Sequence, residues 1–220
     1  MAYVWVLAFC AVFVVHTDAA TVQKVAGDDI YLNVGQKTGV QIGTVFNVYR
    51  NKEVEADFGN LKFATRVFIG RIYAYKVEDD NTIARVRELP SVSELDEQKA
   101  VLKHDMAQPA FVIPVDELFK QGTEDLLNTA IPKLDQLVRF IKRFKALKVR
   151  IEVHTDDLAR DANKISRKQA QSLQNWLVSE HDMNKNMLVP VGYGSQKSIA
   201  TNDSEAGQRR NRRVEVIIED

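Results

Sequence analysis

The sequence predicts an α+β protein in which a small β-barrel-like domain is followed by an α/β sandwich domain. Residues 21–105 contain short β-rich runs separated by glycine and by Asp/Asn turns. Residues 149–216 alternate between strand, helix and Gly-rich turn patterns, as compact α+β units do. Between them, a polar stretch that starts at Ser91 ends near Pro109, where a new apolar strand pattern begins. We therefore expect two domains, residues 21–105 and 106–220.

Composition limits the classes of protein to which the chain can belong. Its 220 residues are 45% hydrophobic, which is enough for a buried core in one large or two small domains. Thirty basic residues balance 30 acidic ones, so no overall field attracts the chain to nucleic acid or to an acidic membrane. Cys10 is the single cysteine, which excludes an intramolecular disulfide and a cysteine-based metal site. We expect neither a metal nor another cofactor.

An apolar run of fourteen residues, Ala2 to Val15, opens the chain. It is short for a span of about 30 Å of hydrocarbon but typical of the hydrophobic region of a secretory signal. Small residues, Ala19 and Ala20, follow it, whereas no Lys or Arg precedes it. We interpret residues 1–20 as a signal peptide, with an uncleaved N-terminal anchor as the alternative. Lipidation of Cys10 is disfavoured because the bulky Phe9 precedes it.

The first exported segment, residues 21–105, contains the strand-like runs DIYLNV, TVFNVYR, RVFIGRIYAYKV and TIARVREL. Short strands with turns every eight to twelve residues or so are typical of small antiparallel barrels and sandwiches. The glycines between the runs suit hairpin turns, which require positive φ. The run from Val25 to Gly35, followed by Gly39-Val40 and Gly43-Thr44, resembles the C-terminal β-module of the flagellar assembly protein FlgT family. This resemblance implies a flagellar partner.

The second segment begins with an expected strand at Ala110–Val115. Asn128 and Thr129 are expected to cap a helix whose apolar positions recur at helical spacing: Ile131, Leu134, Leu137, Val138, Ile141 and Phe144. A half-buried strand, 149–153, precedes a second helix, about 163–178, that leaves Gln174 largely outside. A strand at 187–191 and a last one with alternating Val214, Val216 and Ile218 complete the segment.

Polar residues gather at the ends of these expected elements. His154, Thr155 and Asp156 follow the strand 149–153, where a rigid sheet holds loop residues in place for binding. The basic run Arg209–Arg213 lacks the interleaved aromatic residues that nucleic-acid binding favours, so no nucleic-acid partner is expected. One of Arg212 and Arg213 should pair with a buried carboxylate. The glycines of Gly192-Tyr193-Gly194 lack the Gly-Lys-Ser/Thr ending of a phosphate loop and are interpreted as turn residues.

Several motifs together resemble the OmpA-like cell-wall-binding domain. They are Leu118-Phe119-x-x-Gly122, His154-Thr155-Asp156, Asn163, Ile165-Ser166-x-x-Gln169-Ala170, Gly192-Tyr193-Gly194, Asn202 and Asn211-Arg212-Arg213-Val214-Glu215. Order and spacing agree with the family over about half of the chain. Two positions depart from it: Val153 replaces the usual glycine before His-Thr-Asp, and Gln169 replaces the arginine of the family's helix.

The resemblance implies a periplasmic domain that binds the diaminopimelate-containing stem peptide of peptidoglycan. In the family, the aspartate and the helix arginine hold the amino and carboxylate ends of diaminopimelate. Asp156 matches the aspartate, and Arg167 substitutes for the arginine only if the register of the helix shifts. The expected peptidoglycan-binding residues are His154, Thr155, Asp156, Asn163, Arg167, Gln169, Asn211, Arg212 and Arg213.

Three functions are consistent with these observations. The first is a non-catalytic periplasmic protein that anchors an envelope or flagellar-motor complex to peptidoglycan, with envelope or motor proteins as partners and a homo-oligomeric ring as one arrangement. The second is an envelope assembly scaffold in which Val153 and Gln169 mark a degenerate site. The third is an enzyme with His154, Asp156 and Asp157 as an acid/base cluster. The absence of a nucleophile motif disfavours the third, and we expect no enzyme.

Overall fold

The structure, a computed structural model, describes residues 20–55, 62–91, 100–158 and 161–219. Within these residues it is a mixed α+β protein, which confirms the predicted class. One nine-stranded sheet runs through it in the order β1-β2-β5-β4-β3-β6-β9-β7-β8, and all neighbouring strands are antiparallel except β7 and β8. The predicted signal or anchor, residues 1–20, lies outside the described residues apart from Ala20, as does most of the polar stretch after Ser91.

The N-terminal segment contributes five strands and a short 3-10 helix: β1 Val22–Ala26, β2 Asp29–Leu32, η1 Gln36–Thr38, β3 Val45–Glu55, β4 Lys62–Val77 and β5 Thr82–Glu88. Their inner faces enclose a hydrophobic core around Phe46, Ile72 and Leu32. The expected barrel is not confirmed, because the order of the strands has two ends rather than forming a ring. A single bridge, Thr21 to Met106, nevertheless connects the start of β1 to the start of β6.

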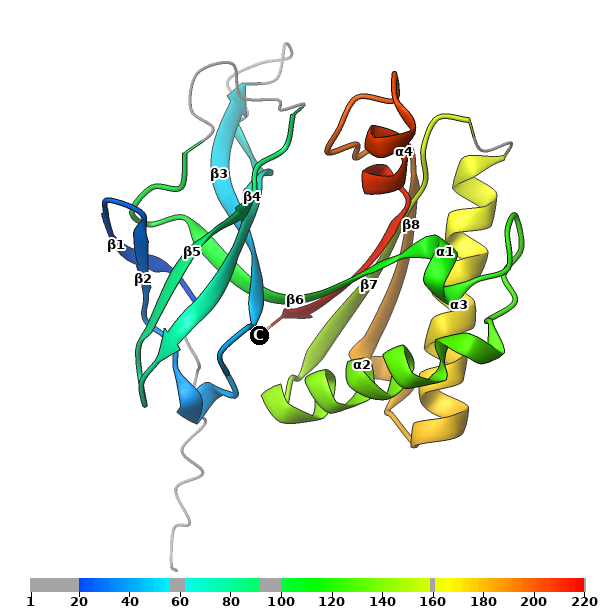
Figure 1. Cartoon of the computed structure of the whole chain (residues 1–220), viewed down its shortest axis with the longest axis horizontal. Helices are drawn as coiled ribbons and strands as arrows, with labels where there is room; N and C mark the ends of the chain where they lie inside the picture. The colour runs from blue at the N-terminus through cyan, green and yellow to red at the C-terminus, as the bar shows by residue number, and fades with distance from the viewer. Residues whose placement is uncertain (1–19, 56–61, 92–99, 159–160, 220) are drawn as a thin grey trace, which may run out of the picture.

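Strand β6, Met106–Pro114, belongs to both segments. Its first half pairs with β3, from Met106 opposite Tyr49 to Ala110 opposite Val45. Its second half pairs with β9, from Ala110 opposite Ile217 to Pro114 opposite Arg213. In Figure 1, β6 crosses the middle of the molecule between the two groups of strands. The domain boundary near residue 105 stays a prediction, since the two segments have separate cores but share this strand.

The C-terminal segment continues with α1 Val115–Leu118, η2 Asn128–Ala130, α2 Ile131–Phe144, β7 Lys148–His154, α3 Ala162–His181, η3 Lys185–Met187, β8 Leu188–Gly194, α4 Glu205–Asn211 and β9 Arg213–Glu219. Helices α2 and α3 cover one face of the sheet formed by β7, β8 and β9 (Figure 1). The core between them contains Leu134, Leu137, Ile151, Leu173 and Val216. Because β7 and β8 are parallel, the chain must cross over between them, and α3 makes that crossover.

A glycine brings α3 into close contact with β8. A Cβ atom at Gly192 would lie 2.2 Å from the backbone nitrogen of Arg167 in α3. Real Cβ atoms essentially never approach backbone so closely, so any other residue would push the helix outward. The interpretation of Gly192-Tyr193-Gly194 as turn residues was wrong, because they form the end of strand β8, where Gly192 permits this close contact with α3.

Two expectations about the helices were wrong. Asn128 and Thr129 do not cap α2: they form η2, and the residue before the helix, Ala130, makes no side-chain capping bond. Gln174 of α3 is buried and donates a hydrogen bond to the carbonyl of Leu188 at 2.8 Å. Its polarity predicted exposure, but the hydrogen bond to β8 satisfies its amide in the interior. Among the described residues, no helix has the length and apolar character needed to cross a membrane.

Candidate functional site

The His-Thr-Asp residues lie at the end of β7, and successive side chains of this strand point to opposite faces of the sheet. Ile151 and Val153 are fully buried in the core under the helices. Glu152 and His154 lie on the opposite face of the strand, away from that core. Thr155 donates its backbone N–H to the carbonyl of Gly194 at 2.9 Å, which ties the end of β7 to the end of β8. Val153, the first departure from the family motif, is therefore a core residue.

Asp156 is held by an arginine. Its Oδ2 accepts a hydrogen bond from Nη1 of Arg212 at 2.6 Å, and its side chain is only 6% exposed. The same guanidinium donates to Asp116 of α1 through Nε at 3.4 Å and Nη2 at 3.3 Å. These two bonds are long compared with the 2.7–2.9 Å or so that is usual for such charged pairs. Oδ1 of Asp156 has no hydrogen-bond partner among the described residues.

Gln169, which stands where the family has its helix arginine, is almost fully buried. Its Nε2 donates to the carbonyl of Thr123 at 2.8 Å, in the loop between α1 and η2. Its Oε1 is buried without a hydrogen-bond partner, and so is the hydroxyl oxygen of Thr155. An unpaired buried polar atom costs about 1 to 3 kcal/mol, so natural proteins leave few of them. Gln169 therefore retains an unpaired acceptor, whereas the sequence suggested a donor.

The first turns of α3 complete this edge of the domain. The hydroxyl of Ser166 accepts the backbone N–H of Gly194 at 3.0 Å, so the helix and both strand ends meet at one residue. Asn163 and Arg167 are exposed, and the guanidinium of Arg167 has no carboxylate partner within the described ranges. We group Thr155, Asp156, Gln169 and Arg212 as the edge site.

His154 belongs to a different environment. Its ring stacks on Tyr193, with ring centres 5.3 Å apart, and its Nε2 lies 3.2 Å from a carboxylate oxygen of Glu152. Burial, reinforced by the charge of Arg213, lowers the pKa of His154. The expected acid/base cluster is not assembled, because His154 faces Glu152 while Asp156 pairs with Arg212 and Asp157 is exposed.

Asn211 and Arg213 also lie outside the edge site. The side chain of Asn211 accepts the backbone N–H groups of Ile199 and Ala200 at 2.9 and 3.1 Å, and it donates to Ala200 and Asn202. Asn211 therefore stabilises the conformation of the loop before α4. Arg213 pairs with the buried Glu215 two residues later on the same face of β9. Both Arg212 and Arg213 thus pair with a buried carboxylate, where the sequence predicted this of one of them.

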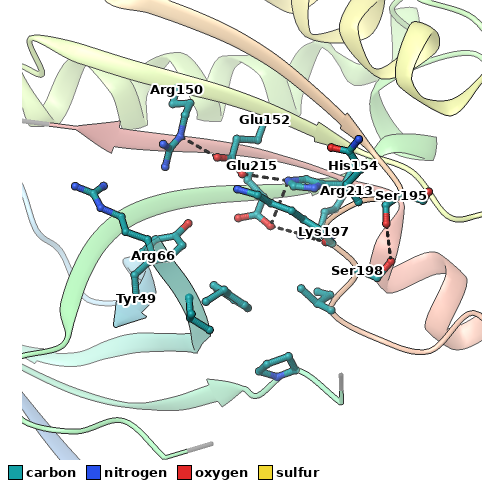
Figure 2. A pocket seen from close by; sticks show the side chains of 15 residues that line it. Tyr49, Arg66, Arg150, Glu152, His154, Ser195, Lys197, Ser198, Arg213 and Glu215 are labelled. Carbon is teal, nitrogen blue, oxygen red and sulfur yellow. Dashed lines mark hydrogen bonds and ion pairs between the residues drawn. The ribbon is translucent and has the colours of Figure 1, made fainter. Parts of the chain in front are cut away.

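Figure 2 shows the face of the sheet on which His154 and Arg213 lie. These residues line a cavity of about 380 Å³ together with Glu152 and Glu215, and Tyr49 and Arg66 of the N-terminal segment border the same cavity. No sequence motif indicated this cavity, because its walls come from two separate parts of the chain, residues 49–90 and 150–215. Asp116 and Thr123, which contact Arg212 and Gln169 of the edge site, were missed too, although the Leu118-Phe119-x-x-Gly122 motif lies between them. Within the described ranges, no group of three His, Cys, Asp or Glu residues is arranged to hold a metal ion.

Comparison with known proteins supports the resemblance inferred from the motifs. Residues 118–212 match the model of the OmpA family. Outer membrane porin F of Pseudomonas aeruginosa is 28% identical over 109 residues, which are 49% of this chain and 31% of that protein. Outer membrane porin F of Pseudomonas fluorescens is 34% identical over 85 residues, which are 38% of this chain and 26% of that protein. The chain thus spans less than a third of the length of these relatives.

Solved structures with a similar arrangement include a putative MotB-like protein from Desulfovibrio vulgaris, with a TM-score of 0.48 and 23% identity. That match covers 51% of this chain and 73% of the other. The cell wall anchor of the T6SS from Pseudomonas aeruginosa has a TM-score of 0.46 and 24% identity, and covers 55% of this chain and 84% of the other.

Proposed function

We propose, from the OmpA-family domain that residues 118–212 match, that this protein is a non-catalytic periplasmic anchor. In this proposal its C-terminal domain binds the diaminopimelate-containing stem peptide of peptidoglycan. An envelope or flagellar-motor complex is thereby held at the cell wall. The single observation that supports it best is the composition of the edge site, which is built from the residues of the family motifs and is incomplete without a ligand.

The unpaired atoms of the edge site can all accept hydrogen bonds. They are Oδ1 of Asp156, the hydroxyl oxygen of Thr155 and Oε1 of Gln169, and the latter two are buried. An ammonium group carries three donors and a positive charge, so it complements a carboxylate flanked by neutral acceptors. We therefore assign the amino end of diaminopimelate to Asp156, as the family resemblance implies, with Thr155 as its neutral partner.

The carboxylate of the ligand requires a cation elsewhere. Arg212 is the better candidate, because it already lies against Asp156 and its two bonds to Asp116 are long, at 3.3 and 3.4 Å. The side chain of Asp116 is 58% exposed. Water can therefore solvate Asp116 when Arg212 leaves it to bind a ligand carboxylate. Arg167 is the alternative, since its exposed guanidinium has no counter-charge within the described ranges. A planar guanidinium suits a carboxylate because it donates two parallel hydrogen bonds.

The N-terminal β-segment would carry the protein partner. Its resemblance to a flagellar β-module supports a motor protein in that role, and assembly of several copies in a ring is consistent with such a complex. The expected export signal supports a periplasmic location for both segments.

The scaffold with a degenerate site is the second candidate, and a specific observation favours it. Asp156 is already paired with Arg212, and the amide nitrogen of Gln169 is bound to Thr123, so both family positions have partners inside the protein. A site that has lost its ligand would have the same internal bonds. The buried unpaired oxygens of Thr155 and Gln169 are the argument against it.

Co-sedimentation of the purified full chain with diaminopimelate-type sacculi separates the two candidates. The anchor proposal expects the wild-type chain to sediment and Asp156→Asn to bind at least about 30-fold more weakly, since truncating a buried charge pair costs about 2 to 5 kcal/mol. Asp157→Asn, an exposed neighbour, is the matched control and should bind like the wild type. Failure of the folded wild-type chain to sediment would favour the scaffold.

A further inference from the structure

The cavity between the two segments is built as a site of its own. Its volume is about 380 Å³, and its walls come from β3 and β4 on one side and from β7, β9 and the 195–199 loop on the other. That loop is held in place, because the carbonyl of Lys197 accepts a hydrogen bond from Nη2 of Arg213 at 3.1 Å. A volume of roughly 300 to 1,000 Å³ is usual for small-molecule sites.

Most charges in the wall already have partners. Arg213 pairs with Glu215, and Arg150 pairs with Glu152 at 2.8 Å. Two cations remain: Arg66 and Lys197 are exposed and have no carboxylate partner within the described ranges. Nζ of Lys197 lies 3.9 Å from the centre of the Tyr193 ring, and His154 stacks on the same ring. The unpaired charge of the cavity is therefore positive and favours an anionic ligand.

His154 adds a requirement for a hydrogen-bond donor. Its side chain is 1% exposed, and its Nε2 lies 3.2 Å from the Glu152 carboxylate, which only accepts hydrogen bonds. The proton of the neutral ring is therefore assigned to Nε2, which leaves Nδ1 as an acceptor. Nδ1 is buried without a partner. His154 lines the cavity, so a ligand hydroxyl group that reaches Nδ1 would satisfy it.

The remaining wall is amphipathic. Tyr49 and Phe68 pack edge to face, with ring centres 5.8 Å apart, and Val67 and Ile199 lie beside them in the lining. Ser195, Ser198 and Gln196 supply further polar groups on the loop. A sugar ring has this combination of properties, since its C–H faces are apolar and its rim of hydroxyl groups needs hydrogen-bond partners.

We propose that this cavity binds an acidic monosaccharide, with the sugar carboxylate near Lys197 and Arg66 and a hydroxyl group donating to Nδ1 of His154. The aromatic rings of Tyr49 and Phe68 would contact a C–H face of the sugar. This site shares no residue with the edge site, so it is independent of the proposed function.

Calorimetric titration of the full chain with glucuronate, and with neutral glucose as the charge-free match, tests the proposal. Glucuronate is expected to bind at least about tenfold more tightly than glucose, because hydrogen bonds between ionised partners are stronger than those between neutral groups. Lys197→Gln should remove most of this preference. Lys185→Gln also removes one positive charge, but at an exposed position outside the cavity. It should leave the preference for glucuronate unchanged.

Nitrogen NMR of the histidine rings gives a second readout that a purely structural role of His154 would not change. Saturating glucuronate should shift the Nδ1 resonance of His154 and leave that of His104 in place. No saturable heat with glucuronate, an equal response to glucose, or an equal effect of Lys185→Gln would each overturn the proposal. An unshifted Nδ1 resonance at saturation would do the same.

Discussion

Arg71 of β4 donates a hydrogen bond to Glu215 of β9 at 2.6 Å, although 144 residues separate them in the chain. Their side chains are only 4% and 3% exposed. Burial alone would raise the pKa of Glu215, but the charges of Arg71 and Arg213 outweigh it and lower that pKa. Asn47 of β3 donates to the same carboxylate. This buried polar cluster joins the N-terminal segment to the C-terminal sheet.

Removing the carboxylate should therefore be costly. Glu215→Gln is expected to lower the free energy of unfolding by about 3 to 5 kcal/mol, because it removes the carboxylate that pairs with the buried Arg213 and leaves Arg71 paired with Glu88 alone. Urea denaturation at pH 7 measures this. The matched control is Glu205→Gln, which breaks an exposed ion pair with Arg209 and should cost less than about 1 kcal/mol. Similar losses in the two variants would contradict the role assigned to the cluster.

Stability should fall as the pH is lowered below about 6.5, the ordinary pKa of histidine. The folded protein holds His154 neutral at pH values where the unfolded chain is already protonated, since burial lowers its pKa. The unfolded state thus binds the extra proton, and the stabilisation present above pH 6.5 or so is lost below it, by at most about 1.4 kcal/mol per pH unit. Urea denaturation at pH 7.5, 6.5 and 5.5 measures this. The free energy of unfolding should fall less steeply with decreasing pH in His154→Gln than in His104→Gln. Equal slopes would be inconsistent with a buried neutral His154.

Restoring the family residue should strengthen the edge site. Gln169→Arg replaces a neutral amide with a guanidinium group that can bind the ligand carboxylate. Hydrogen bonds between ionised partners are roughly twice as strong as neutral ones. Affinity for a diaminopimelate-containing muropeptide, measured by calorimetry, is expected to rise about 5- to 30-fold. Gln171→Arg adds the same charge at an exposed position of α3 and should change affinity little. If both variants bind like the wild type, the edge site is not the ligand site.

The two candidate cations for the ligand carboxylate are distinguishable. Arg212→Ala is expected to weaken muropeptide binding more than about tenfold, as loss of a charged hydrogen bond costs about 1.5 to 3 kcal/mol. Arg167→Ala should weaken it less than about threefold. The reverse order would assign the carboxylate to Arg167. Circular dichroism of both variants controls for folding.

The predicted division near residue 105 is testable by limited proteolysis. Cleavage between Ser91 and Gln108 should release a C-terminal fragment that stays folded, because β6 retains its pairing with β9 and the helices retain their own core. The fragment should be less stable than the intact chain, since it lacks Arg71 and Asn47 beside Glu215. Mass spectrometry identifies the cleavage sites. Degradation without a stable fragment would indicate that the segments fold only together.

The sequence by itself determined the local features of this protein. Alternation in residues 149–153 predicted β7, and helical spacing predicted α2 and its buried Leu134 and Leu137, because these periods reflect which face an element buries. The motif that ends in Asp156 also carried the OmpA resemblance that the family match supports.

Only the tertiary structure decided which residues meet. Alternation placed His154 and Asp156 near the same strand end, but it did not reveal that one faces the cavity while the other pairs with Arg212. Nor did it reveal that β6 continues from β3 to β9. The physical reason is that periodicity records only whether a side chain is buried. Which partner buries it depends on contacts between segments far apart in the chain, such as that of Arg71 with Glu215.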